Sequence, residues 1–402
     1  MTYKPSRLLT YGRQCLDDDD RRAVLEVLES DYLTQGPYVE RFEQALAQRF
    51  DSPHVKVCTN GTAALHLAAL ALGWGPGDVV IVPAITFVAS ANCAVYVGAE
   101  PYFVDIDPVT LCIDPEEVER AVLRLRAANR RVRAVVAVDM AGHPADWVAL
   151  RALADRFDLQ LVDDACHALG ASYAKGSRHI GDGVHADVTT LSFHPVKHIT
   201  TGEGGAVLTR DAQIADKVAL LRSHGIRRDR EQIADWDGPW HLEMTDLGYN
   251  FRLTDIQCAL GLSQLRKLDR FVARRRAIAA LYDTLLPEVG SLRSPVTSPD
   301  VQHSYHLYVV RAPFRSVADR RVLFAAAAER GIQLQVHYRP VPLNGYYVAR
   351  CEPDVMKRLP RAADYYRECF SIPVFPQLEN DEVRYVVDVL RELCEFRSVA
   401  DA

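Results

Sequence analysis

The chain has 402 residues, of which 49% are hydrophobic and 25% charged, and its formal net charge at pH 7 is −6. This length favours two unequal domains over one small core. A negative net charge argues against a nucleic-acid partner or an anionic membrane surface, because both usually require a basic face. The first ten residues lack the apolar stretch of a signal peptide, and no run of 18 apolar residues occurs. We therefore expect a soluble protein with no membrane partner.

The nine cysteines are scattered along the chain, and no two of them form a C-x-x-C pair. Zinc and dithiol redox sites usually show such pairs, so we expect neither of them and no metal. An odd number of dispersed cysteines is typical of reduced thiols, which indicates a cytoplasmic location.

Helix-like and strand-like segments alternate from residue 17 to residue 210. The acidic run 17–20 begins a first helix, because carboxylates are favoured at the positive N-terminal end of a helix. We expect strands at 54–58, 79–82, 102–104, 134–138, 159–162, 188–193 and 206–209, and helices at about 61–73, 86–97, from 114 onward and 146–157. This alternation predicts an α/β fold with a mostly parallel sheet covered on both faces.

The pattern changes after residue 265. Helical stretches at 265–285 and 320–331 flank strand-like runs at 307–310 and 334–338, which predicts a smaller α+β domain. We expect a large domain at 12–265 and a small domain at 266–402, joined by residues 1–11.

Polar residues gather where three of the predicted strands end: Asn60–Thr62, Asp163 and Asp164 with His167, and Ser192–Lys197. Ligands of parallel sheets bind at the carboxyl ends of the strands, so these clusters are expected to share one site.

Lys197 lies on a loop followed by the glycine-rich run 200–205. Most lysines are solvated, but a desolvated lysine loses its proton more readily and can attach covalently to a cofactor carbonyl. Asp164 could pair with a protonated pyridine nitrogen, and its neighbour Asp163 has the same spacing. His167 could flank the cofactor ring or be an ordinary buried histidine.

The run Asn60-Gly61-Thr62 precedes a helix, and free N–H groups at a helix N-terminus favour a phosphate. The same residues also cap helices that bind nothing. Ser192 could add a hydroxyl to that phosphate, and Phe87 could stack on an aromatic cofactor.

Four segments carry a resemblance that extends from about Tyr11 to Pro376: 59–63, 163–170, 192–205 and 247–252. They resemble the DegT/DnrJ/EryC1/StrS family of nucleotide-sugar aminotransferases. The resemblance implies a fold-type-I transferase that uses pyridoxal 5'-phosphate and forms a homodimer with shared active sites. It makes Lys197 the lysine that carries the cofactor, Asp164 the partner of the pyridine nitrogen and His167 a neighbour of the ring. It assigns the phosphate to Gly61, Thr62 and Ser192, with Asn250 from the other subunit.

Four further segments, 31–36, 222–225, 258–264 and 335–340, resemble one subgroup of that family, the transaminases of pseudaminic acid biosynthesis. This resemblance implies amination at C4 of a UDP-linked 4-keto-6-deoxy-N-acetylhexosamine, with glutamate as the amino donor. It would place these residues around the nucleotide sugar: Tyr11, Asp31, Tyr32, Leu33, Thr34, His337, Tyr338, Arg339 and Pro340.

Other functions share parts of this pattern. The dehydratase branch of the family has histidine at the lysine position, so Lys197 favours transamination. The alternatives are an aminotransferase for another nucleotide-linked keto-sugar, a lyase using the same cofactor, and a non-catalytic regulator with this fold. One scaffold hosts many chemistries, so the fold alone does not separate the two enzymes.

Overall fold

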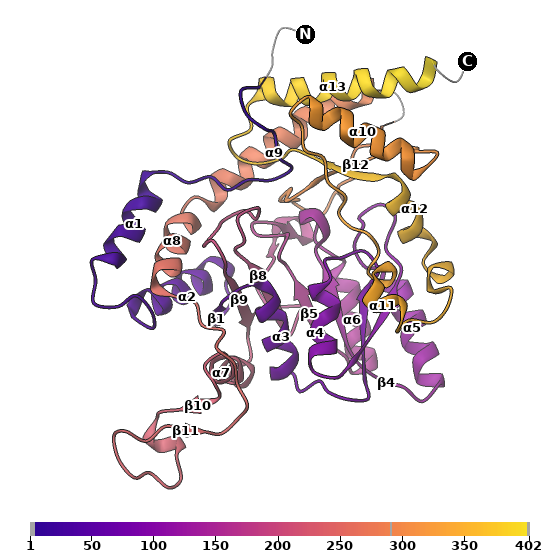
Figure 1. The fold of residues 1–402 in the computed structure, drawn as a ribbon. Coiled ribbons are helices and arrows are strands. Elements are labelled where there is room, and N and C mark those ends of the chain that lie inside the picture. Colours follow the sequence, from indigo (N-terminus) through magenta and orange to yellow (C-terminus); the bar gives the residue numbers. More distant parts are fainter. Residues whose placement is uncertain (1–4, 290–291, 400–402) are drawn as a thin grey trace.

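A seven-stranded sheet in the order β1-β9-β8-β5-β4-β2-β3 forms the centre of the computed structural model, which describes residues 5–289 and 292–399 (Figure 1). Its strands are β1 His54–Cys58, β2 Asp78–Pro83, β3 Glu100–Val104, β4 Arg131–Val138, β5 Gln160–Asp164, β8 Val188–Ser192 and β9 Gly205–Thr209. Strand β9 is antiparallel to β1 and β8, and the other neighbouring pairs are parallel. The predicted fold class is confirmed.

Helices cover both faces of this sheet (Figure 1). The helices up to residue 265 are α1 Asp18–Leu28, α2 Pro37–Phe50, α3 Gly61–Ala71, α4 Ala89–Tyr96, α5 Pro115–Ala127, α6 Trp147–Phe157, α7 Ala212–Leu221 and α8 Asp255–Leu265. Helix α1 lies outside this layer and packs against α8 (Figure 1). Helix α3 packs against α4 and α7, whereas α5 packs against α6. The caps follow the sequence: Asp114 accepts the Glu116 N–H at 2.8 Å before Pro115 at the first position of α5.

A second group of elements lies beside the sheet domain. It contains α9 Leu268–Leu285, β12 Tyr308–Arg311, α10 Val317–Glu329, α11 Gly345–Val348, α12 Pro360–Glu368, β13 Cys369–Ile372 and α13 Asn380–Val399. Short two-residue strands are β6 Ser172–Tyr173, β7 Arg178–His179, β10 Ile226–Arg227 and β11 Glu243–Met244. Strands β10 and β11 form an arm that projects at the lower left of Figure 1.

Two hydrophobic cores stabilise the chain. The first surrounds the sheet and also contains Val341, Leu359 and Tyr365 from the C-terminal third. The second joins α9, α10, α13, β12 and β13, and Leu9 from the N-terminal segment is buried in it. The boundaries 12–265 and 266–402 stay a prediction, and the structure adds that part of the 341–369 segment packs on the sheet domain.

Two local predictions were wrong. The helix expected at 86–97 begins only at Ala89, because the chain after β2 first turns at Thr86 and Phe87. The strand expected at 334–338 is reduced to one bridge, between Gln335 and Ser371. The partner of β12 is β13, which the sequence did not predict.

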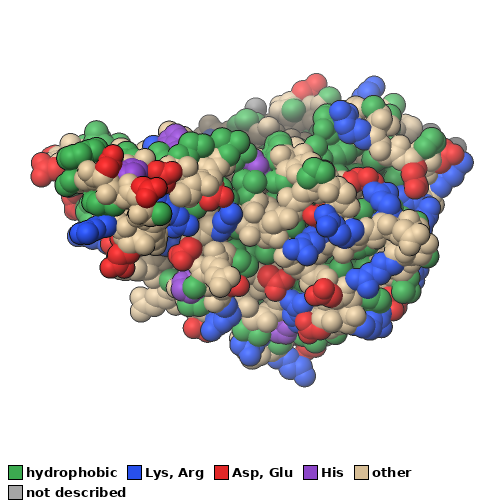
Figure 2. Space-filling view, turned by 90° about the horizontal axis from the view of Figure 1, so that it is seen from below, with side chains coloured by type: hydrophobic (Ala, Val, Ile, Leu, Met, Phe, Trp, Pro, Cys, Tyr) green, Lys and Arg blue, Asp and Glu red, His purple; other side chains and the backbone are tan. Residues whose placement is uncertain are grey.

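The surface shows no strong charge bias on the face seen in Figure 2, where acidic and basic side chains are interspersed. Within the described ranges, no helix is both long and apolar enough to cross a membrane.

Gly205 is the point where β9 passes closest to the turn before α3. A Cβ atom there would lie 2.5 Å from the carbonyl carbon and oxygen of Asn60. We expect Gly205→Ala to lower the free energy of unfolding by about 1–3 kcal/mol, as overpacking does elsewhere. The control is Gly345→Ala, whose added methyl would meet no atom within 4 Å, and we expect a change below about 0.5 kcal/mol. Urea unfolding measures both, and equal midpoints and slopes for the two variants would contradict the prediction.

Candidate functional site

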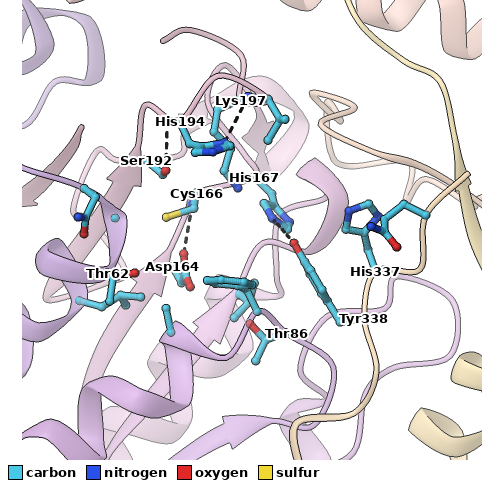
Figure 3. A pocket seen from close by; sticks show the side chains of 18 of the residues that line it. Thr62, Thr86, Asp164, Cys166, His167, Ser192, His194, Lys197, His337 and Tyr338 are labelled. Atoms are coloured by element: carbon cyan, nitrogen blue, oxygen red, sulfur yellow. Dashed lines mark hydrogen bonds between the residues drawn. The ribbon is translucent and has the colours of Figure 1, made fainter. Parts of the chain in front are cut away.

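A cavity of ≈ 570 Å³ opens at the carboxyl ends of the central strands (Figure 3). It brings together eleven residues that the sequence singled out: Tyr11, Asn60, Gly61, Thr62, Phe87, Asp164, His167, Ser192, Lys197, His337 and Tyr338. They come from the N-terminal segment, the ends of β1, β2, β5 and β8, and the segment after α10. Residues up to 327 positions apart in the sequence therefore share one site, as expected for a strand-end ligand pocket.

Lys197 lies on a loop that hydrogen bonds close at its base. The Phe193 N–H donates to the Gly204 carbonyl at 2.8 Å, and the Thr201 N–H donates to the Phe193 carbonyl at 3.0 Å. Gly202 has φ +80°, a conformation that favours glycine. Burial lowers the pKa of the Lys197 ammonium, although the nearby Asp164 opposes that shift. The amine is thereby more readily available in its neutral, nucleophilic form.

Asp163 and Asp164 point to opposite faces of the sheet, because successive side chains of a strand alternate. Asp164 lines the cavity and accepts a hydrogen bond from Ser90 Oγ at 2.6 Å on its Oδ2 atom. Asp163 lies on the other face, where burial and then the nearby Asp139 raise its pKa well above the usual range. The structure therefore places Asp164, and not Asp163, where a ligand in the cavity can meet a carboxylate.

The N-terminus of α3 forms one end of the cavity. The Asn60 side chain caps the helix by accepting the Ala63 N–H at 2.8 Å. A Cβ atom on Gly61 would lie 3.0 Å from Ser192 Cβ and 3.2 Å from Cys166 Sγ, so only glycine leaves this end open. The first N–H groups of a helix have no partner within it, and they make a concave site that favours an anion such as a phosphate.

His167 and Tyr338 form a hydrogen-bonded pair across the cavity (Figure 3). The Ala141 N–H donates to His167 Nδ1 at 3.4 Å, so the ring hydrogen lies on Nε2, which is 3.1 Å from the Tyr338 hydroxyl. Burial lowers the pKa of His167 well below its usual value, and the ring is therefore neutral. The Phe87 ring lies 6.1 Å from the Tyr338 ring and faces the same space.

The sequence did not indicate several residues of this cavity, among them Thr86, Cys166, Gln335 and Val336. Cys166 follows Asp164 at a spacing of two, which is the signal that could have revealed it. Thr86 belongs to the turn between β2 and α4, where the sequence pattern predicts a helix.

Seven predicted residues do not line the cavity of this subunit: Asp31, Tyr32, Leu33, Thr34, Asn250, Arg339 and Pro340. Asp31 to Thr34 and Asn250 are exposed. Arg339 points to the Leu343 carbonyl, 2.9 Å away. No group of three or more potential metal ligands is found in residues 5–289 and 292–399.

A buried lysine, a carboxylate and an open helix N-terminus around one cavity fit the carbonyl, the ring nitrogen and the phosphate of pyridoxal phosphate. Together with the sheet order, they define a fold-type-I pyridoxal-phosphate-dependent transferase.

The comparisons with known proteins then give the family. The model of the DegT/DnrJ/EryC1/StrS aminotransferase family matches residues 14–391. The spore coat polysaccharide biosynthesis protein SpsC of Bacillus subtilis is 35% identical, over 98% of this chain and 99% of its own length. Among solved structures, Helicobacter pylori PseC, an aminotransferase involved in the biosynthesis of pseudaminic acid, is 31% identical with a TM-score of 0.87, over 97% of this chain and 100% of its own. The PLP form of Spr1654 from Streptococcus pneumoniae is 27% identical with a TM-score of 0.85, over 96% and 99%.

The chain belongs to the DegT/DnrJ/EryC1/StrS aminotransferase family. It is an enzyme, a sugar aminotransferase whose cofactor is pyridoxal phosphate.

The contrast between the two aspartates gives a test of the site. Asp164→Asn is expected to slow proton transfer on the cofactor-bound substrate by about 100-fold or more, because a preorganised charge partner is lost. Asp163→Asn is expected to leave the rate close to that of the wild type, since burial beside Asp139 already favours the protonated acid, which an amide resembles. Stopped-flow absorbance of the cofactor after mixing with amino donor measures both rates. A slow Asp163→Asn and a normal Asp164→Asn would reverse the assignment.

Proposed function

We propose that the protein transfers an amino group to C4 of a UDP-linked 4-keto-6-deoxy-N-acetylhexosamine, with glutamate as donor, in cytoplasmic pseudaminic acid biosynthesis. The observation that carries the proposal is the single cavity that holds the cofactor-binding set around Lys197 and, facing it, His337 and Tyr338. The likeness to PseC over nearly the whole of both chains supports this substrate class. Eight cysteines are free thiols, which supports a reducing compartment: Cys15, Cys58, Cys93, Cys112, Cys166, Cys258, Cys351 and Cys369.

In this proposal each residue acts on a defined part of the reaction. Lys197 would hold the cofactor through its amine and, when free, would act as the general acid and base at the substrate carbon, for which its lowered pKa suits it. Asp164 would pair with the protonated pyridine nitrogen, and the N-terminus of α3 with Ser192 would bind the phosphate. The bound cofactor supplies the electron-withdrawing ring that stabilises negative charge at the reacting carbon.

A second candidate is an aminotransferase for a different nucleotide-linked keto-sugar. It is favoured by the likeness to SpsC, whose name refers to spore coat polysaccharide and whose identity to this chain, 35%, slightly exceeds that of PseC, 31%. A non-catalytic regulator has no observation in its favour.

We also propose a homodimer with shared sites. Three of the predicted residues that miss the cavity, Leu33, Thr34 and Asn250, lie near the start of α8. The Asp255 N–H donates to the Leu33 carbonyl at 3.1 Å, Thr34 bridges to Thr254, and Asn250 precedes Thr254 by four residues. The neighbouring arm exposes apolar side chains, including 73% of Trp240 and 75% of Leu247. An exposed apolar arm next to exposed site residues fits a second copy of this chain, whose cavity those residues would complete.

The substrate is tested by incubating the protein with UDP- and dTDP-linked keto-sugars and glutamate and following product masses. We expect the 4-amino product from the UDP-linked 4-keto-6-deoxy-N-acetylhexosamine and the highest kcat/KM for that sugar. Borohydride should fix the cofactor as a mass adduct on Lys197, and Lys197→Ala should fold but give neither adduct nor product. A preferred dTDP-sugar would favour the second candidate, and an adduct on another lysine would refute the site.

The shared site is tested by complementation between Lys197→Ala and Asn250→Ala. Each homodimer should be inactive, whereas subunit exchange creates dimers in which one site carries both changes and the other carries neither. Random exchange makes half of the dimers mixed, so activity should return to about one quarter of the wild-type level. No recovery from two inactive parents, with exchange shown by mass-tagged subunits, would mean that Asn250 serves its own subunit.

A further inference from the structure

One wall of the cavity is formed by residues 335–341, called here the wall segment, which is irregular until its last residue, Val341, begins a short 3-10 helix. It is held at both ends: Gln335 and Ser371 exchange backbone hydrogen bonds of 3.3 and 2.6 Å, and the Val341 N–H donates to the Ala84 carbonyl at 2.9 Å. Between these ends His337 and Tyr338 face the cavity (Figure 3). Their placement depends on contacts in the middle of the segment.

Two side chains make those contacts. Ser371 Oγ lies 2.8 Å from His337 Nδ1, and the Tyr365 hydroxyl donates to the His337 carbonyl oxygen. That oxygen belongs to the planar peptide unit that joins His337 to Tyr338. A donor on it therefore fixes the plane from which both cavity side chains extend. Tyr365 itself is fully buried on α12, in the core of the sheet domain.

Helix α12 is anchored at its N-terminus by a residue from the far edge of the sheet. Its own N-cap position, Leu359, offers no side-chain acceptor. Asp105, which directly follows β3, accepts the N–H of Arg361 at 2.9 Å and that of Ala362 at 2.8 Å. The Asp105 side chain is 1% exposed, so these donors replace the water that its carboxylate would otherwise require.

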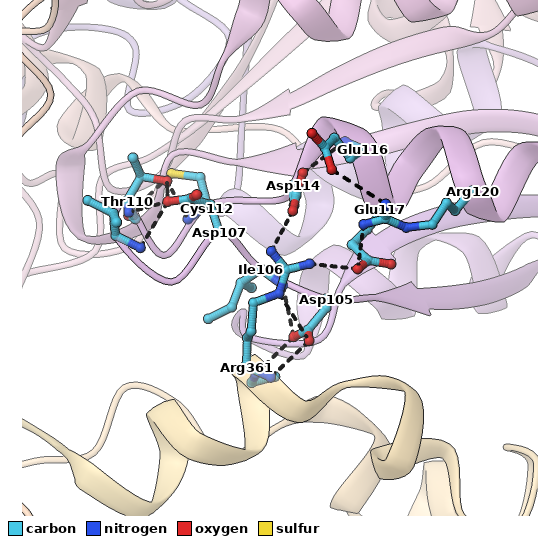
Figure 4. Close-up of polar contacts among 12 residues, drawn as sticks. Asp105, Ile106, Asp107, Thr110, Cys112, Asp114, Glu116, Glu117, Arg120 and Arg361 are labelled. Carbon is cyan, nitrogen blue, oxygen red and sulfur yellow. Dashed lines mark hydrogen bonds and ion pairs between the residues drawn. The ribbon is translucent and has the colours of Figure 1, made fainter.

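The Arg361 side chain turns back and completes the anchor (Figure 4). Its guanidinium lies 3.5 Å from Asp105, 2.6 Å from Asp114 and 2.6 Å from Glu117. Asp114 is also the N-cap of α5, so one arginine ties together the N-terminal ends of two helices. Arg361 and Tyr365 are four residues apart, which places the anchor and the wall-facing hydroxyl one turn apart on the same side of α12.

We propose that Asp105, Arg361 and Tyr365 are positioning residues that determine how His337 and Tyr338 face the sugar substrate. The inference rests on the proposed function, because it assigns the wall segment to the sugar. It places determinants of sugar affinity at the edge strand β3, outside every segment that carries the family resemblance. None of the three residues lines the cavity.

Tyr365→Phe tests this proposal, because it removes one hydroxyl and keeps the ring in the core. The KM for the keto-sugar should rise about tenfold while kcat stays within about twofold, which is the pattern for lost uniform binding. The KM for the amino donor and the absorbance of the bound cofactor should not change. Amide hydrogen exchange of residues 335–341 should become faster, and that of the central sheet should not. Asp105→Asn, which weakens the anchor from its other end, should give the same pattern.

Tyr366→Phe is the matched control. It removes a hydroxyl from the next position of the same helix, where the ring packs 4.8 Å from the Arg320 guanidinium, and it should behave as the wild type in every measurement. The proposal is overturned if Tyr365→Phe leaves both the sugar KM and the exchange of the wall segment unchanged. It is also overturned if exchange rises throughout the sheet, since Tyr365 would then only stabilise the fold. If the wild type aminates no UDP-keto-sugar, the proposed function fails. Amide hydrogen exchange of the wall segment in the variants then still decides whether Asp105, Arg361 and Tyr365 hold that segment in place.

Discussion

The removal of the Lys197 amine from water is the constraint on which the site depends. A lysine in water is an ammonium, and an ammonium neither attacks a carbonyl nor accepts a proton. The protein lowers the pKa of Lys197 by burying it on a hydrogen-bonded loop at the end of β8. The strand ends place two groups in the same cavity: Asp164 from β5, which partly opposes the lowered pKa, and His167, which is neutral.

The sheet domain was predictable from the sequence because its local and global signals agree. The strand 54–58 was predicted to the residue, and the caps at Asp114 and Asp146 follow from side chains that accept N–H groups two or three positions ahead. Because the strands were predicted correctly, the sequence also placed Asn60, Asp164 and Lys197 together at the carboxyl ends of the strands. Sequence spacing left Asp163 and Asp164 equivalent, and the alternation along β5 then separated them.

What the sequence did not reveal depends on contacts between distant segments. The run 334–338 has the alternation of a strand, but residues 335–338 line a cavity and only Gln335 forms a bridge, to Ser371. Strand β12 pairs instead with β13, which begins 61 positions further along. The residues Leu33, Thr34 and Asn250 gather near the start of α8 through backbone contacts that no periodicity encodes. Asp105 is a further example, since it caps a helix that begins 255 residues later.

Asp139 and Asp163 have a consequence for the underside of the sheet. Asp139 Oδ2 and Asp163 Oδ1 are buried oxygens that no hydrogen-bond donor of the described chain reaches. Burial raises both pKa values, so the folded protein retains a proton that the unfolded chain releases above about pH 4. The retained proton stabilises the folded protein fully below that pH, and this stabilisation is lost as the pH rises through the raised pKa values of Asp139 and Asp163. Below the raised pKa values the two acids are protonated to a greater extent than free carboxyls, so less negative charge lies on the face of the sheet opposite the cavity that Asp164 lines. In alkaline solution both acids would ionise, and a cofactor held by Lys197 and Asp164 would then meet added negative charge from a pair that lies outside the cavity lining.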